Sequence, residues 1–511
     1  MILAIDQGTT GSTAIIFNAD GQMIARTYSE FNQIYPQASW VEHDPMEIWQ
    51  VTLDTIIEAI SKAHIKASEI KSIGITNQRE TTVLWDKTSG LPVHNAIVWQ
   101  CRRSSDICQQ IKADGKAPWI QQKTGLVVDA YFSASKIKWI FDHHPDIKQQ
   151  ANEGKLAFGT IDSWLIWNLT GGNSHVTDHT NASRTLLYNI HDHGWDEELL
   201  AFFDIPTAIL PQIQASAGDF GSTRSGLFEG KGFEGAGSEG AGFEGARFEG
   251  VSISINGVAG DQQAALFGQG CVNPGEVKNT YGTGCFMLMQ TGDKAVTSDN
   301  GLLTTIACNA SGQPSYALEG SVFMAGAAVQ WLRDEMGLIS KANETEAIAQ
   351  SIPDTAGVYV VPAFTGLGAP HWDMNARGAI VGLTRGSGKK HIVRATLEAI
   401  AWQTRDVLQL MEQESKVKLK ALKVDGGACA NNFLMQFQSD ILDLEIIRPN
   451  NVDSTALGAA LLAGIGAGLW QAGKLPKGVT TPDRQFTPAM DEDSRQQQAA
   501  GWATAVARVV I

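Results

Sequence analysis

Two segments of this chain repeat one order of elements, and this repeat constrains the fold more than any other feature. Residues 1–25 read MILAIDQGTTGSTAIIFNADGQMIA, and residues 275–296 read GEVKNTYGTGCFMLMQTGDKAV. Each segment has an apolar strand, a turn of Gly and Thr, a second apolar strand, and a turn with Asp and Gly. The repeat predicts two domains on a common plan, beginning near residues 1 and 257, although two unrelated β-hairpins would give the same pattern.

Elsewhere strand patterns alternate with helix patterns, which indicates an α/β fold with layers of helices on sheets. The apolar run at 456–470 predicts a buried helix with Asp453 or Ser454 as its N-cap, and it is too short to span a bilayer. Further strands are predicted at 72–78, 81–86 and 422–427, and helices at 129–144, 391–414 and 431–442.

Charge and cysteine usage exclude some classes of protein. The formal net charge of −15 disfavours nucleic acid as a partner, because its phosphates would be repelled. The six cysteines form no C-x-x-C pair and are typical of reduced, buried thiols. We therefore expect a cytoplasmic protein without a membrane span.

Two polar stretches carry no clear chemistry. Residues 226–250 form five units of five residues ending in EG, a period that matches neither helix nor strand, so we expect a surface insertion or a contact surface for a partner. The stretch 175–193 contains four histidines without a full set of metal ligands, so a solvated loop is expected there.

Gly-Thr turns suit phosphate, since they offer backbone N–H groups and hydroxyls without bulky side chains. Two such turns, Gly8–Thr10 and Gly282–Gly284, could grip a polyphosphate from two sides. Asp6 is well placed to hold the water shell of Mg²⁺. The turn at Gly426 and Gly427, before a helix at Asn431, could receive a nucleoside.

Two further motifs allow a functional and a structural interpretation. Asp261 stands at the start of a predicted helix, where it could be a general base for phosphoryl transfer or an ordinary N-cap. Arg79 and Glu80 in NQRET could bind a polyol by hydrogen bonds or form a surface salt bridge at the end of a strand.

Taken together, nine stretches resemble the FGGY carbohydrate kinases, and most closely the members that phosphorylate glycerol. They occur in the family's order and cover nearly the whole chain outside 205–250. The stretches are DQGTT (6–10), NQRET (77–81), IVWQCRR (97–103), DAYFSASK (129–136), GVAGDQQAALFGQ (257–269), NTYGTGCF (279–286), GSVFMAGAAVQWLRD (320–334), APHWDMNARGAIVGLTRG (369–386) and VDGGACANNFLMQFQSDIL (424–442).

The resemblance implies two RNase-H-like domains of the actin, hexokinase and Hsp70 superfamily with an interdomain cleft. The N-terminal domain would be 1–256 and the C-terminal domain 257–511. The reaction would be phosphorylation of glycerol by ATP and Mg²⁺ to sn-glycerol 3-phosphate, the entry step of glycerol catabolism. A homo-oligomer, either a dimer or a tetramer, is expected.

The resemblance also implies roles for individual residues. Asp261 would be the general base, and Asp6 the carboxylate associated with the metal. Glycerol would be bound by Arg79, Glu80, Trp99, Tyr131, Asp261, Gln262 and Phe286. The nucleotide would be bound by Thr9, Thr10, Gly282, Thr283, Gly326, Gln330, Gly427 and Asn431.

The chain departs from the family at two places. Thr13 stands where members often carry an Arg that reaches the phosphates, so phosphate binding is expected to depend on Thr hydroxyls and backbone donors. The 226–250 segment holds five Glu against one Lys and one Arg, so inhibition by fructose bisphosphate is not expected. A kinase for another polyol or sugar, and an ATP-dependent switch without transfer activity, remain alternatives.

Deleting residues 226–250 is predicted to leave the chemical step nearly intact, because the segment lies outside the nine matching stretches and surface insertions are tolerated. The measurement is the turnover number of the deletion variant beside that of the full chain. A large fall in turnover would contradict the assignment of this segment as an insertion.

Overall fold

The computed structural model describes residues 1–228, 250–373, 375–450, 453–474, 476, 479 and 482–510. Contacts divide the chain into two compact units, each built from separate stretches of sequence. The first unit comprises Met1–Val272, Thr305–Tyr316 and Asp453–Thr480, and the second comprises Asn273–Thr304, Ala317–Val452 and Thr481–Ile511. Residues just after 256, where the second domain was predicted to begin, thus pack with the N-terminal residues.

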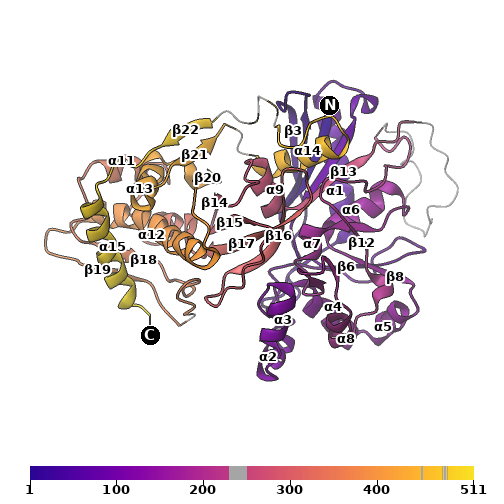
Figure 1. The fold of residues 1–511 in the computed structure, drawn as a ribbon, viewed down its shortest axis with the longest axis horizontal. Helices are drawn as coiled ribbons and strands as arrows, with labels where there is room; N and C mark the ends of the chain where they lie inside the picture. The colour runs from indigo at the N-terminus through magenta and orange to yellow at the C-terminus, as the bar shows by residue number, and fades with distance from the viewer. Residues whose placement is uncertain are drawn as a thin grey trace. The chain divides into compact units, whose positions relative to one another are not determined.

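The first unit is built on a five-stranded sheet in the order β13-β5-β1-β2-β3, of which β13 and β3 are labelled in Figure 1. Strand β1 forms the predicted antiparallel hairpin with β2 and runs parallel to β5, which runs parallel to β13. The strands predicted in this part of the chain are therefore confirmed. Their bounds are β1 (Ile2–Gln7), β2 (Gly11–Phe17), β3 (Met23–Glu30), β5 (Ser72–Asn77) and β13 (Ile255–Gly260).

The second unit is built on a seven-stranded sheet in the order β16-β17-β15-β14-β20-β21-β22, although residues 305–316, around the turn from β16 to β17, are counted with the first unit. Strand β14 pairs antiparallel with β15 and parallel with β20, which runs parallel to β21. The two hairpins thus occupy equivalent places in two sheets, which favours duplication over coincidence. The bounds are β14 (Glu276–Tyr281), β15 (Cys285–Gly292), β16 (Leu303–Cys308), β17 (Pro314–Val322), β20 (Ala421–Asp425), β21 (Ile446–Pro449) and β22 (Pro482–Phe486).

Helices and short strands complete both units. In the first unit they are α1 (Pro45–Lys62), α2 (Ser105–Ala113), α3 (Ala117–Thr124), α4 (Ser133–His143), α5 (Pro145–Asn152), α6 (Ile161–Thr170), α7 (His179–Ala182), α8 (Glu197–Phe203), α9 (Asp261–Gly268), α14 (Ser454–Gly466), the 3-10 helices Ala67–Glu69 and Thr207–Ile209, and the strands β4 (Glu42–His43), β6 (Val83–Asp86), β7 (Ala96–Ile97), β8 (Leu156–Gly159), β9 (Val176–Asp178), β10 (Tyr188–Asn189), β11 (Gly194–Trp195) and β12 (Gln212–Gln214). In the second unit they are α10 (Gly326–Asp334), α11 (Glu344–Gln350), α12 (Lys389–Ser415), α13 (Asn432–Leu442), α15 (Glu492–Ala507), the 3-10 helix Gly427–Ala430, β18 (Tyr359–Val361) and β19 (Ala379–Val381).

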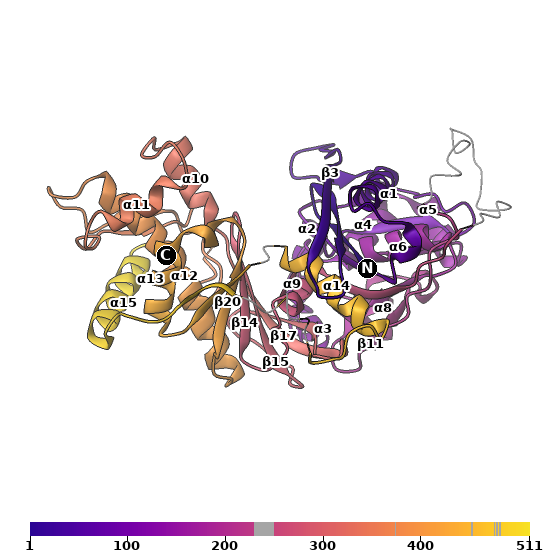
Figure 2. The same cartoon turned by 90° about the horizontal axis from the view of Figure 1, so that it is seen from above.

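Helices cover both faces of the first unit's sheet (Figure 2). Along each strand, successive side chains point to opposite faces. Leu3 and Ile5 of β1 belong to a buried cluster with apolar side chains of α1 and α6. Ile2 and Ala4 belong to a different cluster, with side chains of α9 and α14. The central strand is therefore apolar at consecutive positions, as expected for a strand buried on both faces.

Helix α14 confirms the buried helix predicted from the apolar run, and Asp453 is its N-cap residue. Glycines bring it close to its neighbours. A Cβ placed on Gly458 would lie 1.8 Å from the carbonyl oxygen of Ala264 in α9, and one on Gly74 in β5 would lie 2.1 Å from the carbonyl oxygen of Ala459. Backbone therefore packs on backbone at this interface, where larger side chains have no room.

The prediction of a solvated loop at 175–193 is wrong. Residues 176–178 and 180–190 are buried, and in this stretch only His191 and Asp192 are exposed. The polar side chains are compatible with burial because they hydrogen-bond to one another and to neighbouring segments. Asp178, for example, accepts hydrogen bonds from Thr180, Asn181 and Ser216.

Other expectations concern burial and membranes. All six cysteines are unpaired and buried, as predicted. Among the helices of the described residues, none combines the length and apolar character that crossing a membrane requires. The 226–250 segment lies outside the described residues, apart from 226–228 and residue 250.

We predict that Gly458→Ala destabilises the first unit by about 1–3 kcal/mol, because the added methyl group would overlap the backbone of α9. The measurement is the free energy of unfolding from denaturant titration. Gly194→Ala is the matched control, since the nearest atom to its added Cβ would be the Asp192 carbonyl oxygen at 3.9 Å. Equal stability of the two variants would contradict this account of the packing.

Candidate functional site

The end of β5 places two charged side chains in the interior of the first unit. Arg79 is 3% exposed and Glu80 is 1% exposed. Glu80 has a φ of 62°, a left-handed conformation that is uncommon for a residue with a side chain, and its carbonyl oxygen accepts a hydrogen bond from Ser133 Oγ at 3.0 Å. Burial excludes the surface salt bridge that the sequence left open.

These two residues belong to a chain of charges that ends at Asp261. Arg79 Nε lies 3.1 Å from Asp261 Oδ1 and 3.8 Å from Glu80 Oε1. The same oxygen of Glu80 also accepts a hydrogen bond from Arg184, whose Nε donates to Oε1 at 2.6 Å. The buried charges thus alternate in sign, which makes their burial tolerable.

Asp261 is the first residue of α9, and Gly260 is the N-cap. Its carboxylate accepts a hydrogen bond from the backbone N–H of Gln262 at 2.7 Å, and 34% of its side chain is exposed. The charge chain therefore ends in a carboxylate that solvent or a ligand can reach.

Aromatic rings line the same region. The rings of Trp99 and Tyr131 meet edge to face with centroids 5.6 Å apart, and the Arg184 guanidinium lies 5.7 Å from the centroid of Tyr131. Trp99 Nε1 donates to Thr9 Oγ1 at 3.0 Å. A continuous network therefore joins six of the predicted residues, namely Asp261, Arg79, Glu80, Tyr131, Trp99 and Thr9.

The turn between β1 and β2 is closed by a hydrogen bond from Gly8 N to Gly11 O at 2.9 Å. Gln78, next to Arg79, donates to Gly8 O at 3.2 Å and so ties this turn to the end of β5. Thr10 is exposed, whereas Thr13 further along β2 is 9% exposed. Thr10 can therefore offer its hydroxyl to a ligand, and Thr13 is mostly enclosed by protein.

Asp6 lies at the end of β1, opposite Thr13. The pKa of Asp6 is raised to about 7, mainly by burial and further by the negative charges of Asp261 and Asp453, while Arg26 acts in the opposite direction. Oxygen donors in this negative environment fit Mg²⁺, which binds one or two carboxylates and keeps several waters. No group of three or more His, Cys, Asp or Glu suited to a metal occurs among the described residues, so such an ion would also need water or a ligand oxygen.

The second unit carries the other Gly-Thr turn, at Gly282 and Thr283 between β14 and β15. Helix α10 begins against this turn, because Gly326 N donates to Gly282 O at 3.0 Å and Ala327 N donates to Thr283 O at 3.1 Å. A Cβ on Gly326 would lie 2.6 Å from Gly282 O, so only glycine permits this approach. Gln330 is exposed one turn along the same helix.

The turn after β20 also packs closely against the end of β14, and a glycine again permits the approach. Gly426 has a φ of 87°, and a Cβ there would lie 2.4 Å from Tyr281 O. The next residue, Gly427, is exposed, with no atom within 4 Å of its Cβ position. Asn431 caps α13 by accepting from Leu434 N at 3.0 Å. The structure thus gathers the predicted nucleotide residues of the second unit around two glycine turns, and Phe286 is half-buried on β15 of this unit.

Sequence reasoning missed two buried cations beside this site. Arg184 is fully buried against Glu80, and Lys136 donates to the carbonyl oxygens of Tyr131 and Phe132. Burial lowers the pKa of Lys136 to about 8. The signal for Lys136 was its place in the DAYFSASK motif, and that for Arg184 was a cation inside an otherwise uncharged run, NASRTLLYNI.

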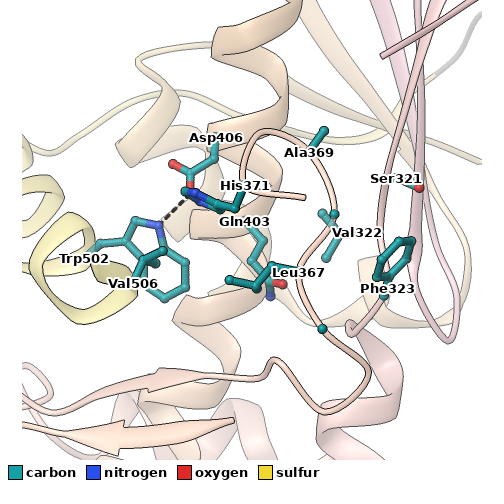
Figure 3. A pocket seen from close by; sticks show the side chains of 12 residues that line it. Ser321, Val322, Phe323, Leu367, Ala369, His371, Gln403, Asp406, Trp502 and Val506 are labelled. Atoms are coloured by element: carbon teal, nitrogen blue, oxygen red, sulfur yellow. Dashed lines mark hydrogen bonds and ion pairs between the residues drawn. The ribbon is translucent and has the colours of Figure 1, made fainter. Parts of the chain in front are cut away.

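A pocket in the second unit contains none of the predicted residues (Figure 3). Gln403, Leu367 and Phe323 line it, and Trp502 Nε1 donates to Asp406 at 2.7 Å at one side. His371 lies near the same carboxylate, with 3.9 Å between Nε2 and Oδ2. The sequence offered no signal for this pocket, since its residues come from distant segments.

Comparison with known proteins gives matches over the whole chain. The N-terminal domain of the FGGY family of carbohydrate kinases matches residues 1–268, and the C-terminal domain of that family matches residues 277–467. Glycerol kinases from Symbiobacterium thermophilum and Shewanella woodyi are each 55% identical, over 99% and 100% of this chain and 98% and 99% of their own lengths.

Solved structures are similar over the same length. The structure of Plasmodium falciparum glycerol kinase with ADP has a TM-score of 0.91 and 37% identity, covering 100% of this chain and 98% of that one. A xylulose kinase from Brucella ovis has a TM-score of 0.84 at 22% identity, covering 99% of this chain and 97% of its own, which shows similarity of fold.

The raised pKa of Asp6 predicts a pH-dependent stability. The folded protein holds the proton more tightly than the unfolded chain, so the contribution of Asp6 to stability falls as the pH rises between about 4 and 7. We therefore expect Asp6→Asn to raise the melting temperature relative to the unchanged protein by more at pH 8 than at pH 5, with metal chelated. Asp20→Asn, at an exposed turn, is the control. A difference that does not grow with pH would contradict the prediction.

Proposed function

Because the chain belongs to the FGGY family of carbohydrate kinases, we propose that it transfers the γ-phosphoryl group of ATP to glycerol. The products are sn-glycerol 3-phosphate and ADP. The names of the 55% identical relatives support glycerol as the acceptor, and the ADP in the related solved structure supports the nucleotide.

The observation that carries the proposal is the charge chain that ends at Asp261. Glu80 and Arg79 are held rigidly in the interior, whereas the Asp261 carboxylate is partly exposed. Trp99 and Tyr131 add an aromatic wall to the same network. Glycerol has three hydroxyls on three carbons, so fixed charged groups suit its hydroxyls and aromatic rings suit its CH groups.

In the proposed reaction a terminal hydroxyl of glycerol attacks the γ-phosphorus in line with the leaving group. A bond forms between this oxygen and phosphorus, and the bond from phosphorus to the bridging oxygen of ADP breaks. The hydroxyl proton passes to the carboxylate of Asp261. An ionised Asp is a weak base, but the transition state is loose, and positioning with charge neutralisation supplies most of the rate. No covalent phospho-enzyme is formed.

The nucleotide is assigned to both predicted sets of residues. Thr9 and Thr10 of the first unit, and Thr283 of the second, offer hydroxyl donors to the phosphates, and Gly282 places no side chain in front of its turn. The remaining nucleotide residues are Gly326, Gln330, Gly427 and Asn431. Phe286 and Gln262 complete the proposed glycerol residues.

Magnesium is part of the proposal because the donor set at Asp6 fits it. Asp6 would hold the ion, which when bound neutralises charge on the phosphates. The half-buried carboxylate is poorly solvated, as its raised pKa indicates, so a nearby cation would favour its ionised form.

Location and assembly complete the proposal. Six unpaired, buried cysteines support a reducing compartment, and we place the enzyme in the cytoplasm. A homo-oligomer, either a dimer or a tetramer, is proposed as well, and the molar mass in solution tests it. We also retain the proposed domain boundary at 256/257, which limited proteolysis tests.

We predict that Asp261→Asn lowers kcat for glycerol by about 10²–10⁴-fold, because the amide cannot accept the proton. ATP affinity, measured by calorimetry, is expected to stay within about twofold, since the substitution removes an acceptor of the proton and keeps the shape of the site. Asp54→Asn on α1, whose carboxylate accepts from Gln50, is the matched control and should keep full activity. Unimpaired transfer by the Asp261 variant would rule out the proposed base.

The acceptor is tested directly by an ATP-dependent assay with glycerol, dihydroxyacetone, erythritol and xylulose. Glycerol is expected to have the highest kcat/KM. A preference for xylulose or erythritol would assign the chain to another substrate within the family. ATP binding without transfer to any acceptor would instead indicate a nucleotide-dependent switch.

A further inference from the structure

A buried polar segment, residues 178–184 with the sequence DHTNASR, contacts Gly260, Asn77 and Glu80, which lie in the segments that supply the charge chain. Asp178, Thr180, Asn181 and Arg184 in this segment are each fully buried. We propose that Asp178 is a positioning residue that fixes Asp261 and the Arg79–Glu80 pair relative to each other through hydrogen bonds to Thr180 and Asn181. This inference rests on the proposed function, because it assigns those charged residues to one reaction.

The first arm runs from Asp178 to the start of α9. Asp178 Oδ2 accepts from Thr180 Oγ1 at 2.7 Å and from Thr180 N at 3.0 Å. Thr180 Oγ1 in turn accepts from the backbone N–H of Gly260 at 2.9 Å. Because its own proton goes to Asp178, the hydroxyl is oriented to accept from Gly260, the residue directly before Asp261. The carboxylate thus fixes the backbone from which the proposed base projects.

The second arm runs from Asp178 to the end of β5. Asp178 Oδ1 accepts from Asn181 N at 3.0 Å and Asn181 Nδ2 at 2.9 Å. The Asn181 amide forms a reciprocal pair with the Asn77 amide, at 3.0 and 3.1 Å. Asn77 is the last residue of β5, two positions before Arg79. The same carboxylate therefore holds both segments that supply the charge chain.

Two more contacts complete the arrangement. Ser216 Oγ donates to Asp178 Oδ2 at 2.6 Å, so donors surround both oxygens of the carboxylate. At the other end of the segment, Arg184 holds Glu80. Hydrogen bonds to an ionised carboxylate are short and strong, and a fully satisfied buried network is rigid. In the part of the chain that the structure describes, the hydrogen bonds of the Asp178 carboxylate go to Thr180, Asn181 and Ser216 and to no proposed substrate residue, which makes Asp178 a positioning residue.

An Asn at this position would break one arm. Asn offers one acceptor oxygen and one NH₂ group, and the NH₂ group would face donors from either Thr180 or Asn181. Displacing a reacting group by about 1 Å can lower a rate by roughly 10²-fold. The loss is therefore expected in the chemical step rather than in nucleotide binding.

The chain offers a matched control for this substitution. Asp162 is also fully buried and accepts from two threonine hydroxyls, Thr160 Oγ1 and Thr177 Oγ1, the latter at 2.7 Å. Burial raises the pKa of Asp162 to about 7, with a further contribution from the charge of Asp178. No hydrogen bond recorded for its side chain within the described residues leads to Gly260 or Asn77, so Asp162→Asn tests the cost of altering a buried carboxylate alone.

The experiment compares Asp178→Asn with Asp162→Asn, and Thr180→Val with Thr180→Ser. We expect Asp178→Asn and Thr180→Val to lower kcat for glycerol by about 10- to 100-fold, with the Kd for ATP within about twofold of the unchanged protein. Asp162→Asn and Thr180→Ser should keep kcat within about threefold, since Ser retains the hydroxyl that Val lacks. Melting temperature is measured for each variant.

Two outcomes would overturn the inference. One is full kcat in Thr180→Val, which stays informative even if Asp178→Asn does not fold. The other is an equal loss of kcat in Asp162→Asn and Asp178→Asn. If the unchanged protein transfers no phosphate to glycerol, the proposed function fails instead, and the four variants are then assayed with whichever acceptor the panel identifies.

Discussion

The buried Arg79 guanidinium is the constraint on which the candidate site depends. It lies beside two carboxylates, and removing one partner from a buried pair generally costs about 3–5 kcal/mol because a charge is left without compensation. Arg184 is a second cation on the Glu80 carboxylate, with its Nε 2.6 Å from Oε1. Gly260 belongs to the same constraint, since a Cβ there would lie 2.7 Å from Arg79 Cγ and Cδ. The residue before Asp261 is therefore a glycine, because the aliphatic part of the Arg79 side chain occupies the space that a Cβ would need.

In the second unit, glycines allow segments of backbone to lie close to one another. Gly326 approaches Gly282, and Gly426 approaches Tyr281, at distances that exclude any larger residue. Turns packed in this way have backbone without side chains in front of it, and Gly427 at one of them is exposed. The first unit thus presents charged side chains at the candidate site, and the second unit presents glycine turns.

Local sequence patterns predicted the strands and helices. The buried polar contacts could not be predicted, because they join residues that are distant in sequence. The hairpins and helices α12, α13 and α14 were predictable because hydrophobic periodicity and turn residues act over a few positions. The burial of Asp178 and Arg184 was not predictable, because it depends on Asn77, Glu80 and Gly260, which lie far away along the chain. The motif residues pointed to the site, but their sequence does not reveal that Glu80 is left-handed or that a second arginine holds it.

The late position of α14 in the chain has a consequence for biosynthesis. The last strand of the first unit's sheet ends at Gly260, whereas the helix that covers part of its second face ends at Gly466, roughly 200 residues later. At 5–20 residues per second, a ribosome needs roughly 10–40 s to cross that interval. For that time the nascent sheet has apolar side chains of β1 and β2 without their final cover. The growing polypeptide therefore depends on delayed collapse or on a chaperone until its C-terminal third emerges.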